Sequence, residues 1–152
     1  MTGVSHAITG ALIAVVVKEP AIALPAALLS HFVCDMVPHV GTKDIKDKSK
    51  RRTLSHRIYK IDLALILIFF AGLFMLNAPE VVIASAFLAG SPDFVWFYRY
   101  IIKEQIQKIN PGPMNVLSRF HSRIQRSETL KAGVPIEIVY SSCLLFVVIN
   151  QL

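Results

Sequence analysis

Three residues that could bind a metal ion or move a proton recur at intervals of four within one apolar stretch. His31, Asp35 and His39 lie in the sequence LSHFVCDMVPHV. A step of four places His31 and Asp35 on one face of a helix, and His39 would follow about 80° further round if the helix continued past Pro38. Imidazole and carboxylate groups are good ligands for zinc, manganese or iron, and they are costly to bury unpaired. The spacing predicts a metal or proton-handling site, although each residue alone could be a satisfied polar group at a helix end.

The composition indicates a membrane protein. The 152 residues are 54% hydrophobic and only 17% charged, and the mean hydropathy is +0.55. A chain of this length suits one domain, residues 1–152, and so apolar a domain is expected to be embedded in a membrane. The formal net charge of +6 fits cytoplasmic loops that face anionic lipid. No nucleic-acid-binding motif accompanies this charge, so we expect no nucleic-acid partner.

Five apolar segments are expected to form the helices of an all-α, polytopic membrane bundle. They cover residues 4–17, 21–37, 61–76, 80–98 and 134–149. The sequence Gly90-Ser91-Pro92 should kink or break the fourth segment. At ~1.5 Å per residue the helices reach roughly 21 to 28 Å, slightly less than the ~30 Å hydrocarbon core of a bilayer. Their ends should therefore lie near the membrane interface.

Charged and amphipathic segments separate the apolar ones. Residues 43–60 carry charges of both signs and are interpreted as a solvated loop. Residues 101–109 are amphipathic and are expected to continue the fourth helix along the surface. Residues 115–133 predict a second amphipathic helix, with Phe120 and Ile124 on its apolar face. Lying on the membrane, this interfacial helix could cover the site.

The distribution of lysine and arginine orients the bundle. Eight of the 16 basic residues lie in 43–60, seven lie between Arg99 and Lys131, and Lys18 is the remaining one. Loops rich in Lys and Arg stay in the cytoplasm, and two loops separated by two membrane spans lie on one side. We therefore expect the N-terminus and both basic segments in the cytoplasm, with Lys18, Asn77 and the C-terminus on the opposite side.

This orientation brings the chemically capable side chains to one depth. The charge count did not use them, yet they all fall at the cytoplasmic ends of their segments: His6, His31, Asp35, His39, Asp93, His121 and Glu137. Scattered structural polar residues should have fallen on both sides of the membrane. The agreement favours one shared site.

Several short motifs are similar to those of a known family. They are Ser5-His6, Leu29-Ser30-His31 through Asp35 to Pro38-His39, Gly90-Ser91-Pro92-Asp93, and Phe120-His121-Ser122-Arg123-Ile124-Gln125 with Glu137 beyond. Together they resemble a family of small, multi-pass proteins of the bacterial inner membrane that are regarded as membrane-bound metal-dependent hydrolases and are distantly similar to zinc-dependent phospholipase C. The resemblance covers most of the chain and is most specific between His31 and His39. It implies a helical membrane protein with a His/Asp metal centre that hydrolyses a phosphoester or a lipid. Such sequences often carry an acidic residue where Val40-Gly41-Thr42 stands here, which implies one ion or weaker binding.

We expect a metal-dependent hydrolase that acts on a phospholipid or another phosphoester or ester at the cytoplasmic face. Each candidate residue then has an expected role. The expected ligands of a divalent metal, zinc first and manganese or iron as alternatives, are His6, His31, Asp35, Asp93 and His39. The metal would lower the pKa of a bound water toward ~7. Glu137 or His121 would act as general base or acid, and Arg123 with Gln125 would hold a phosphate. Arg123 and Gln125 could equally form a solvated helix face, and Glu137 could serve the helix dipole.

Two other functions are compatible with the sequence. A proton or divalent-cation transporter would also use intramembrane His and Asp residues, although here they cluster on one side. A non-enzymatic membrane adaptor would explain the basic segments and leave His6, His31 and Asp93 without a role. The oligomeric state is left open.

Overall fold

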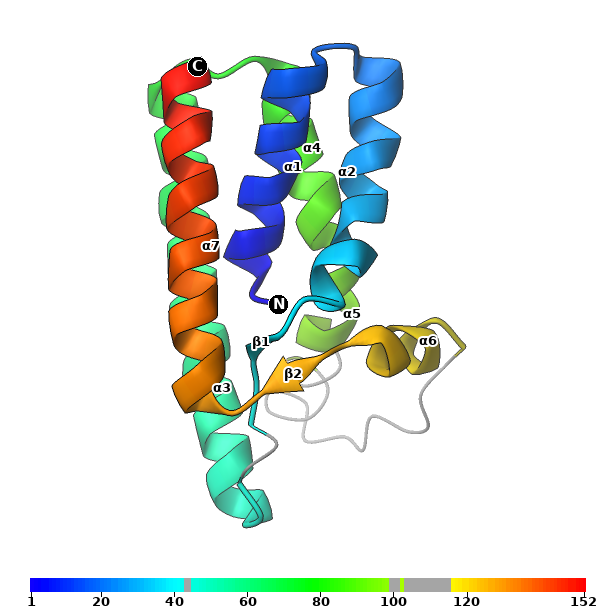
Figure 1. Cartoon of the computed structure of the whole chain (residues 1–152), viewed down its shortest axis with the longest axis vertical. Coiled ribbons are helices and arrows are strands. Elements are labelled where there is room, and N and C mark those ends of the chain that lie inside the picture. Colours follow the sequence, from blue (N-terminus) through cyan, green and yellow to red (C-terminus); the bar gives the residue numbers. More distant parts are fainter. Residues whose placement is uncertain (43–44, 99–101, 103–115) are drawn as a thin grey trace.

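The longest helices run alternately up and down along one axis in a computed structural model of the chain (Figure 1). It describes residues 1–42, 45–98, 102 and 116–152. These helices are α1 (Gly3–Val17), α2 (Pro20–Asp35), α3 (Lys48–Met75), α4 (Glu80–Gly90) and α7 (Leu130–Gln151). The shorter elements are β1 (His39–Val40), the 3-10 helix η1 (Ser91–Asp93), α5 (Phe94–Phe97), α6 (Val116–Ile124) and β2 (Ser127–Glu128). The described residues are therefore almost entirely helical, as the sequence predicts.

Helix α1 is central, and small residues allow its neighbours to approach it closely. It packs against α2, α3, α4 and α7. Ala7, Ala11 and Ala14 are buried on it. At Gly10, an added Cβ would lie only 2.3 Å from the carbonyl oxygen of Ser85 on α4. Close backbone contact between α1 and α4 therefore depends on glycine and alanine, as in many helix pairs of membrane proteins.

Helices α3 and α7 present apolar side chains outward. They are the two helices among the described residues that are long and apolar enough to cross a membrane. Only 11% of the most apolar 18-residue window of α3 and 17% of that of α7 is buried. Ile68 on α3 is 67% exposed and Phe146 on α7 is 70% exposed. An apolar helix at the core of a soluble protein would bury most of this surface. Helices α1 and α2 are also apolar but shorter.

The interpretation of residues 43–60 as a loop is wrong for most of that segment. Helix α3 begins at Lys48 and continues without interruption into the apolar part. Asp47 caps its start, because its carboxylate accepts hydrogen bonds from the backbone of Ser49 at 2.8 Å and of Lys50 at 3.2 Å. A carboxylate at this position satisfies free N–H groups and favours the helix dipole. The charged run is therefore the first half of a long helix.

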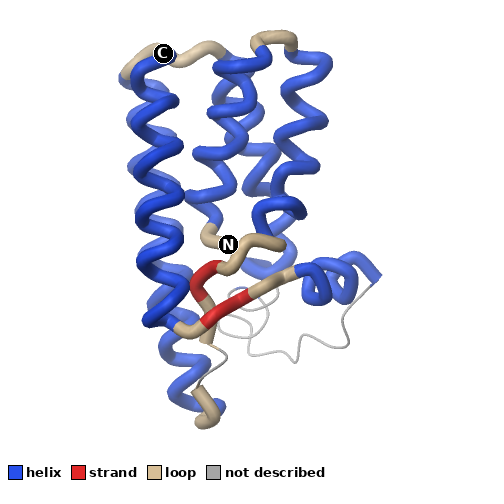
Figure 2. The backbone as a smooth tube through the Cα atoms, in the orientation of Figure 1, coloured by secondary structure: helices blue, strands red, loops and turns tan. Residues whose placement is uncertain are grey.

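The helix expected over residues 115–133 is interrupted. Helix α6 ends at Ile124, and Ser127–Glu128 pair in parallel with His39–Val40, the two short strands coloured red in Figure 2. Helix α7 then begins at Leu130, ahead of its predicted start at residue 134. Strands of two residues are too short to show the alternation of apolar and polar residues that identifies a strand in a sequence.

His39 does not lie on the helix that carries His31. Helix α2 ends at Asp35, and His39 begins β1. Pro38 explains the early end, since a proline disfavours helical backbone at the residue before it, Val37. The condition for the 80° offset of His39, a helix that continues past Pro38, is therefore not met.

The predicted break in the fourth apolar segment is confirmed. Helix α4 ends at Gly90, η1 occupies Ser91–Asp93, and α5 continues from Phe94. The break places Asp93 at the end of α4, where η1 contacts α2. The amphipathic continuation predicted over residues 101–109 lies outside the described residues, apart from Ile102.

Candidate metal centre

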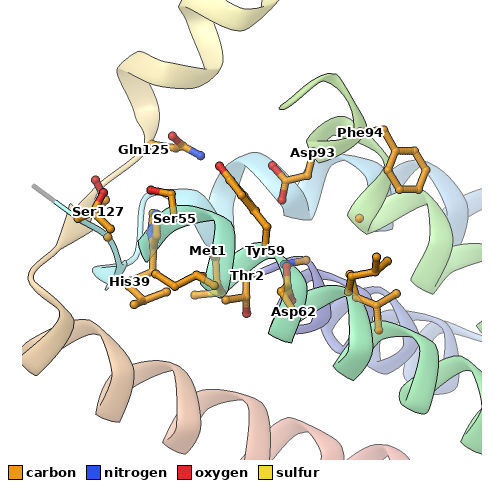
Figure 3. A pocket seen from close by; sticks show the side chains of 18 of the residues that line it. Met1, Thr2, His39, Ser55, Tyr59, Asp62, Asp93, Phe94, Gln125 and Ser127 are labelled. Atoms are coloured by element: carbon orange, nitrogen blue, oxygen red, sulfur yellow. The ribbon is translucent and has the colours of Figure 1, made fainter. Parts of the chain in front are cut away.

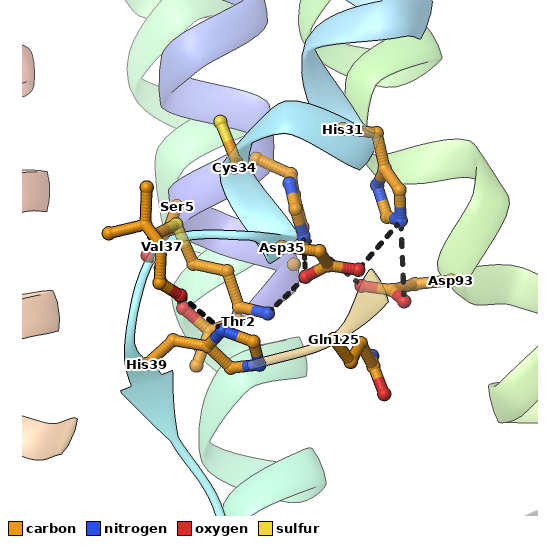
Figure 4. A network of polar contacts seen from close by, with 12 residues as sticks. Thr2, Ser5, His31, Cys34, Asp35, Val37, His39, Asp93 and Gln125 are labelled. Atoms are coloured by element: carbon orange, nitrogen blue, oxygen red, sulfur yellow. Dashed lines mark hydrogen bonds and ion pairs between the residues drawn. The ribbon is translucent and has the colours of Figure 1, made fainter. Parts of the chain in front are cut away.

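Five side chains from four elements meet inside one end of the bundle. They are His6 from α1, His31 and Asp35 from α2, Asp93 from η1 and His121 from α6. Figure 4 shows three of them, His31, Asp35 and Asp93, pointing toward one another. His6, His31, Asp35 and His121 are at most 3% exposed, and the Asp93 side chain is 25% exposed. Their donor atoms form two overlapping groups, each with all its atoms within 4.8 Å of one another: His6, His31 and Asp93, and His31, Asp35 and His121. This buried cluster could hold a metal ion.

The separations between donor atoms are those expected around a small cation. His31 Nε2 lies 3.2 Å from His121 Nε2, 3.5 Å from Asp35 Oδ2 and 3.8 Å from Asp93 Oδ1. His6 Nε2 lies 3.3 Å from Asp35 Oδ1 and 3.8 Å from Asp93 Oδ2. Ligands bound at ~2.0–2.2 Å from one ion are separated from their neighbours by roughly 3 to 3.5 Å. The His31–His121, His31–Asp35 and His6–Asp35 separations fall within or near this range, and those to Asp93 are slightly longer.

The backbone orients the ring of His31 for metal binding. Its Nδ1 lies 2.8 Å from the carbonyl oxygen of Ala89, at the end of α4. Because a carbonyl oxygen can only accept, Nδ1 carries the proton and Nε2 keeps its lone pair toward the cluster. Histidines that bind metals are commonly held in this way through their other nitrogen.

The surroundings of His6 favour a bound ion. Among the described residues, neither of its buried ring nitrogens has a hydrogen-bond partner. Nε2 lies 3.3 Å from Asp35 Oδ1 without hydrogen-bond geometry. The ring stacks on His31, with centroids 3.9 Å apart and planes at 25°. A buried unsatisfied polar group costs about 1–3 kcal/mol, and an ion bound to Nε2 would relieve that cost.

Asp35 is the most heavily engaged carboxylate of the cluster. Its Oδ1 accepts from the amino group of Met1, and its Oδ2 accepts from His121 Nε2 at 2.5 Å. His121 Nε2 also lies 3.4 Å from Gln125 Nε2. The sequence predicted His121 as an acid or base, whereas its nitrogen here lies among the candidate ligand atoms.

Backbone contacts explain why His121 reaches the cluster from a distant part of the sequence. The backbone N–H of Arg126 donates to the carbonyl oxygen of Asp35 at 2.8 Å, and that of His39 donates to Arg126 at 3.2 Å. On α6 itself, the ring of Phe120 packs against Phe32 of α2, with centroids 5.8 Å apart. These contacts fasten the segment from α6 to β2 over the end of α2.

The electrostatics of Asp93 differ from those of Asp35. Desolvation, together with the nearby Asp35 charge, raises the pKa of Asp93 to about 7, although a quarter of its side chain is still exposed. Without a cation, this carboxyl group would hold a proton at neutral pH part of the time. A bound cation would replace that proton.

A cavity of about 480 Å³ lies beside the cluster, between the first half of α3, β1, η1 and the segment after α6 (Figure 3). Its polar lining includes His39, Ser55, Tyr59, Asp62, Asp93, Ser122, Gln125 and Ser127. Its apolar lining includes Ile58, Leu63, Ile66 and Phe94. Asp93 is shared by the cluster and the cavity, so a molecule bound in the cavity would lie against the candidate metal centre.

His39 lies beside the cavity and outside both groups of candidate ligands. Its Nδ1 lies 2.8 Å from the carbonyl oxygen of Val37, so Nδ1 carries the proton and Nε2 is the nitrogen with a lone pair. In the view of Figure 4 it lies across Asp35 from His31. Burial lowers the pKa of His39 from 6.5. This position suits a proton acceptor better than a ligand shared with His6 and His31.

Glu137 does not line the cavity; its carboxylate is fully engaged. Oε2 accepts from the backbone of Thr2 at 3.2 Å, from Thr2 Oγ1 at 2.5 Å and from Ser5 Oγ at 3.3 Å, while Oε1 accepts from the backbone of Val40 at 3.0 Å. Glu137 therefore joins α7 to the start of α1 and to β1. Of the predicted phosphate-binding pair, Gln125 lines the cavity, whereas Arg123 is exposed and does not.

Asp62 is a residue near the site that the sequence did not single out. Its carboxylate, on α3, accepts hydrogen bonds from the backbone of Gly3 at 2.8 Å and of Val4 at 2.9 Å. It therefore caps α1 from another helix and fixes the turn that carries His6. A single acidic residue at the start of the most apolar segment was the available signal, because such a charge needs a partner.

Comparisons with protein-family models, curated proteins and solved structures found no match for this chain. What the site can do must therefore be argued from its own geometry.

Proposed function

We propose that this protein is a membrane-bound metal-dependent hydrolase that cleaves a phosphoester or ester in an amphiphilic lipid at the cytoplasmic face of the bacterial inner membrane. One observation carries the proposal: a buried His/Asp cluster, with His6 unsatisfied and His31 oriented by Ala89, borders a cavity large enough for a substrate. A purely structural cluster would satisfy its own nitrogens and would need no adjoining cavity.

The outward faces of the helices support a membrane location. The second half of α3 and most of α7 expose apolar side chains. The basic residues of the first half of α3 are exposed at the same end of the bundle as the cluster: Lys48, Lys50, Arg51, Arg52, Arg57 and Lys60. Basic side chains next to an apolar span interact with anionic headgroups on the cytoplasmic side. The cluster would then lie at headgroup depth.

The lining of the cavity suits an amphiphile. Asp93, His39 and Gln125 supply a polar side next to the cluster. Leu63 and Ile66 line the cavity and belong to the apolar part of α3, which also has side chains that face outward from the bundle. A lipid could place its headgroup ester against Asp93 and the start of its chain along α3 without leaving the membrane interface.

The residues at the site have complementary tasks in hydrolysis. A divalent ion held by the cluster would polarise the scissile bond and lower the pKa of a water. His39 Nε2 could accept a proton from a water in the cavity, with Nδ1 held by Val37. The Gln125 amide could donate to an ester or phosphate oxygen. Glu137 and Asp62 hold the backbone of this region in place and take no part in proton transfer.

The first test of this function is metal content together with turnover. Protein purified in detergent is compared with His31→Ala and Asp35→Ala by elemental mass spectrometry, and hydrolysis of phospholipids and of soluble phosphoesters is measured on the same samples. We expect wild-type protein to contain a transition metal and to hydrolyse lipid, and both variants to lose metal and activity. Glu80→Gln is the matched control, since this carboxylate lies at the opposite end of α4 from the cluster.

Different outcomes would support other functions. Metal binding without hydrolysis, combined with metal-dependent ion flux in liposomes, would replace the hydrolase by a transporter. A folded protein that binds no metal, and whose His31→Ala variant behaves as wild type, would support an adaptor.

A further inference from the structure

The two groups of candidate ligands share one atom. Both contain His31, and the hydrogen-bond and ion-pair contacts of His31 with His121, Asp35 and Asp93 all use Nε2. Its Nδ1 is bonded to the carbonyl oxygen of Ala89 and is unavailable. An imidazole nitrogen has a single lone pair in the ring plane and binds one ion at a time. The two groups therefore describe one ion position.

The charges of the site also indicate a single ion. Asp35 and Asp93 carry two negative charges, one of which already faces the amino group of Met1, and the three imidazoles bind as neutral ligands. The neighbouring carboxylates Glu137 and Asp62 are already occupied by backbone N–H groups. A second divalent ion would add two positive charges with no neighbouring carboxylate left to compensate them, which is unfavourable in a buried site.

The number of donors then indicates the coordination. We infer that the cluster binds a single divalent ion through five protein ligands, three imidazole nitrogens and two carboxylate oxygens, with a sixth position open toward the cavity. Asp93, the partly exposed ligand, borders that open side. A zinc ion held by His31, Asp35, His121 and one water would leave both buried ring nitrogens of His6 without a hydrogen-bond partner. The donor set instead suits an ion that accepts five or six nitrogen and oxygen ligands, such as Mn²⁺ or Fe²⁺. This inference rests on the metal centre of the proposed function and adds its stoichiometry and coordination.

Cobalt titration measures both properties without an activity assay. The full chain, purified in detergent and stripped of metal, is titrated with Co²⁺ while the visible absorption is recorded. We expect saturation at one equivalent and the weak absorption of five- or six-coordinate Co²⁺. Saturation at two equivalents, or the intense absorption of tetrahedral Co²⁺, would overturn the inference.

Ligand variants show whether all five side chains take part. We expect His6→Gln, Asp93→Asn and His121→Gln each to weaken Co²⁺ binding by more than about tenfold, since loss of a mere hydrogen-bond partner of a ligand already costs about 10- to 100-fold. His39→Gln is the control and should bind Co²⁺ as wild type does. Circular dichroism checks that each variant is folded. Unchanged binding in Asp93→Asn and His121→Gln would reduce the site to fewer ligands and contradict the inference.

These results are independent of the proposed hydrolysis. One tightly bound ion with five ligands and no turnover on any lipid or phosphoester would refute the proposed function and leave the site as inferred. Hydrolysis with two ions per chain would support the proposed function and overturn the inferred single-ion site.

Discussion

His39 and His121 show how backbone contacts assign chemical roles to similar side chains. His121 presents Nε2 to Asp35 at 2.5 Å and lies inside the cluster. His39 donates Nδ1–H to Val37 and lines the cavity. The sequence suggested the opposite roles, with His39 as a ligand and His121 as an acid or base. Both are buried, so in the proposed site their position relative to Asp35 separates the candidate ligand from the proposed proton acceptor.

Replacing His39 should reduce turnover without removing the metal. In His39→Ala and His39→Gln we expect kcat to fall about 10²- to 10⁴-fold, the usual contribution of a general base or acid. The metal content should remain that of wild type, because His39 is outside both groups of candidate ligands. Elemental analysis and lipid hydrolysis on the same preparations check this. If metal is lost in both variants, His39 is a ligand after all.

The pH dependence of kcat tests the same residue. A base works in its neutral form, and burial lowers the pKa of His39 below 6.5. Activity should therefore persist below pH 6.5 and decline only as the pH falls through the lowered pKa. The acidic limb should be absent from the residual activity of His39→Ala. Metal content is measured at each pH, since protonation of ligand histidines also releases metal in acid. An acidic limb centred at or above pH 6.5, with metal retained, would contradict the assignment.

Residue types and spacing identified many of the site residues, but they could not identify the hydrogen-bond partners that orient these residues. The step of four residues identified His31 with Asp35, and the charge distribution indicated that His6, Asp93 and His121 share their depth. The contacts that orient His31 and His39 come from the backbone carbonyl oxygens of Ala89 and Val37, and backbone atoms carry no signature in a sequence.

Among the secondary-structure elements, α1 depends on caps that other helices supply. It lacks a side-chain cap of its own at Thr2, and the backbone N–H groups of Gly3 and Val4 donate to the carboxylate of Asp62 of α3 instead. His6 lies within the next turn. The strength of this cap therefore bears on the position of a candidate ligand as well as on stability.

Asp62→Ala should weaken both folding and metal binding. Loss of a capping carboxylate costs about 0.5–2 kcal/mol, and α1 would lose the contacts that fix its first turn. We expect a lower thermal unfolding temperature in detergent and weaker Co²⁺ binding. Asp47→Ala is the control, because Asp47 also caps two backbone N–H groups but at the exposed start of α3. Equal effects of the two substitutions on Co²⁺ affinity would show that the cap does not position His6.

The close contact between α1 and α4 leads to a second prediction, which concerns stability. A Cβ at Gly10 would meet the carbonyl oxygen of Ser85 at 2.3 Å, so Gly10→Ala must push the two helices apart. We expect it to lower the free energy of unfolding by about 1–3 kcal/mol. At Gly72 of α3 nothing lies within 4 Å of an added Cβ, so Gly72→Ala should raise that free energy by about 0.5–1 kcal/mol through helix propensity. Denaturation in detergent compares the two, and similar destabilisation by both would exclude close packing as the cause.

The existence of the apolar helices was predictable, whereas some of their ends were not. Long apolar runs must be helical wherever backbone groups leave water, so α1, α2, α3, α4 and α7 followed from the sequence. The start of α3 at Lys48 depends on the cap by Asp47 inside a charged run that resembles a loop. The pairing of β1 with β2 joins residues far apart in the sequence through two residues each, too few for any pattern.

At the scale of the whole molecule, the arrangement of helices agrees with the orientation expected from charge. The basic first half of α3, together with β1, β2 and α6, lies at the end of the bundle that holds the cluster (Figure 1). The turns at Lys18 and Asn77, both with positive φ, connect helices at the other end. If the apolar faces of α3 and α7 lie in a bilayer, the site faces the cytoplasm and can take lipid from the inner leaflet.

Thiol labelling in intact cells tests this orientation. The chain contains a buried cysteine, Cys34, and an exposed one, Cys143, in the apolar part of α7. We expect Asn77→Cys to react with a membrane-impermeant maleimide added outside, and Lys50→Cys to react only after the membrane is permeabilised. Cys143 is the internal control: it faces outward from the protein, so poor labelling before and after permeabilisation means that lipid covers α7. Labelling of Cys143 by the aqueous reagent would show that α7 is in water. Labelling of Lys50→Cys from outside would reverse the orientation and move the cluster away from the cytoplasmic leaflet.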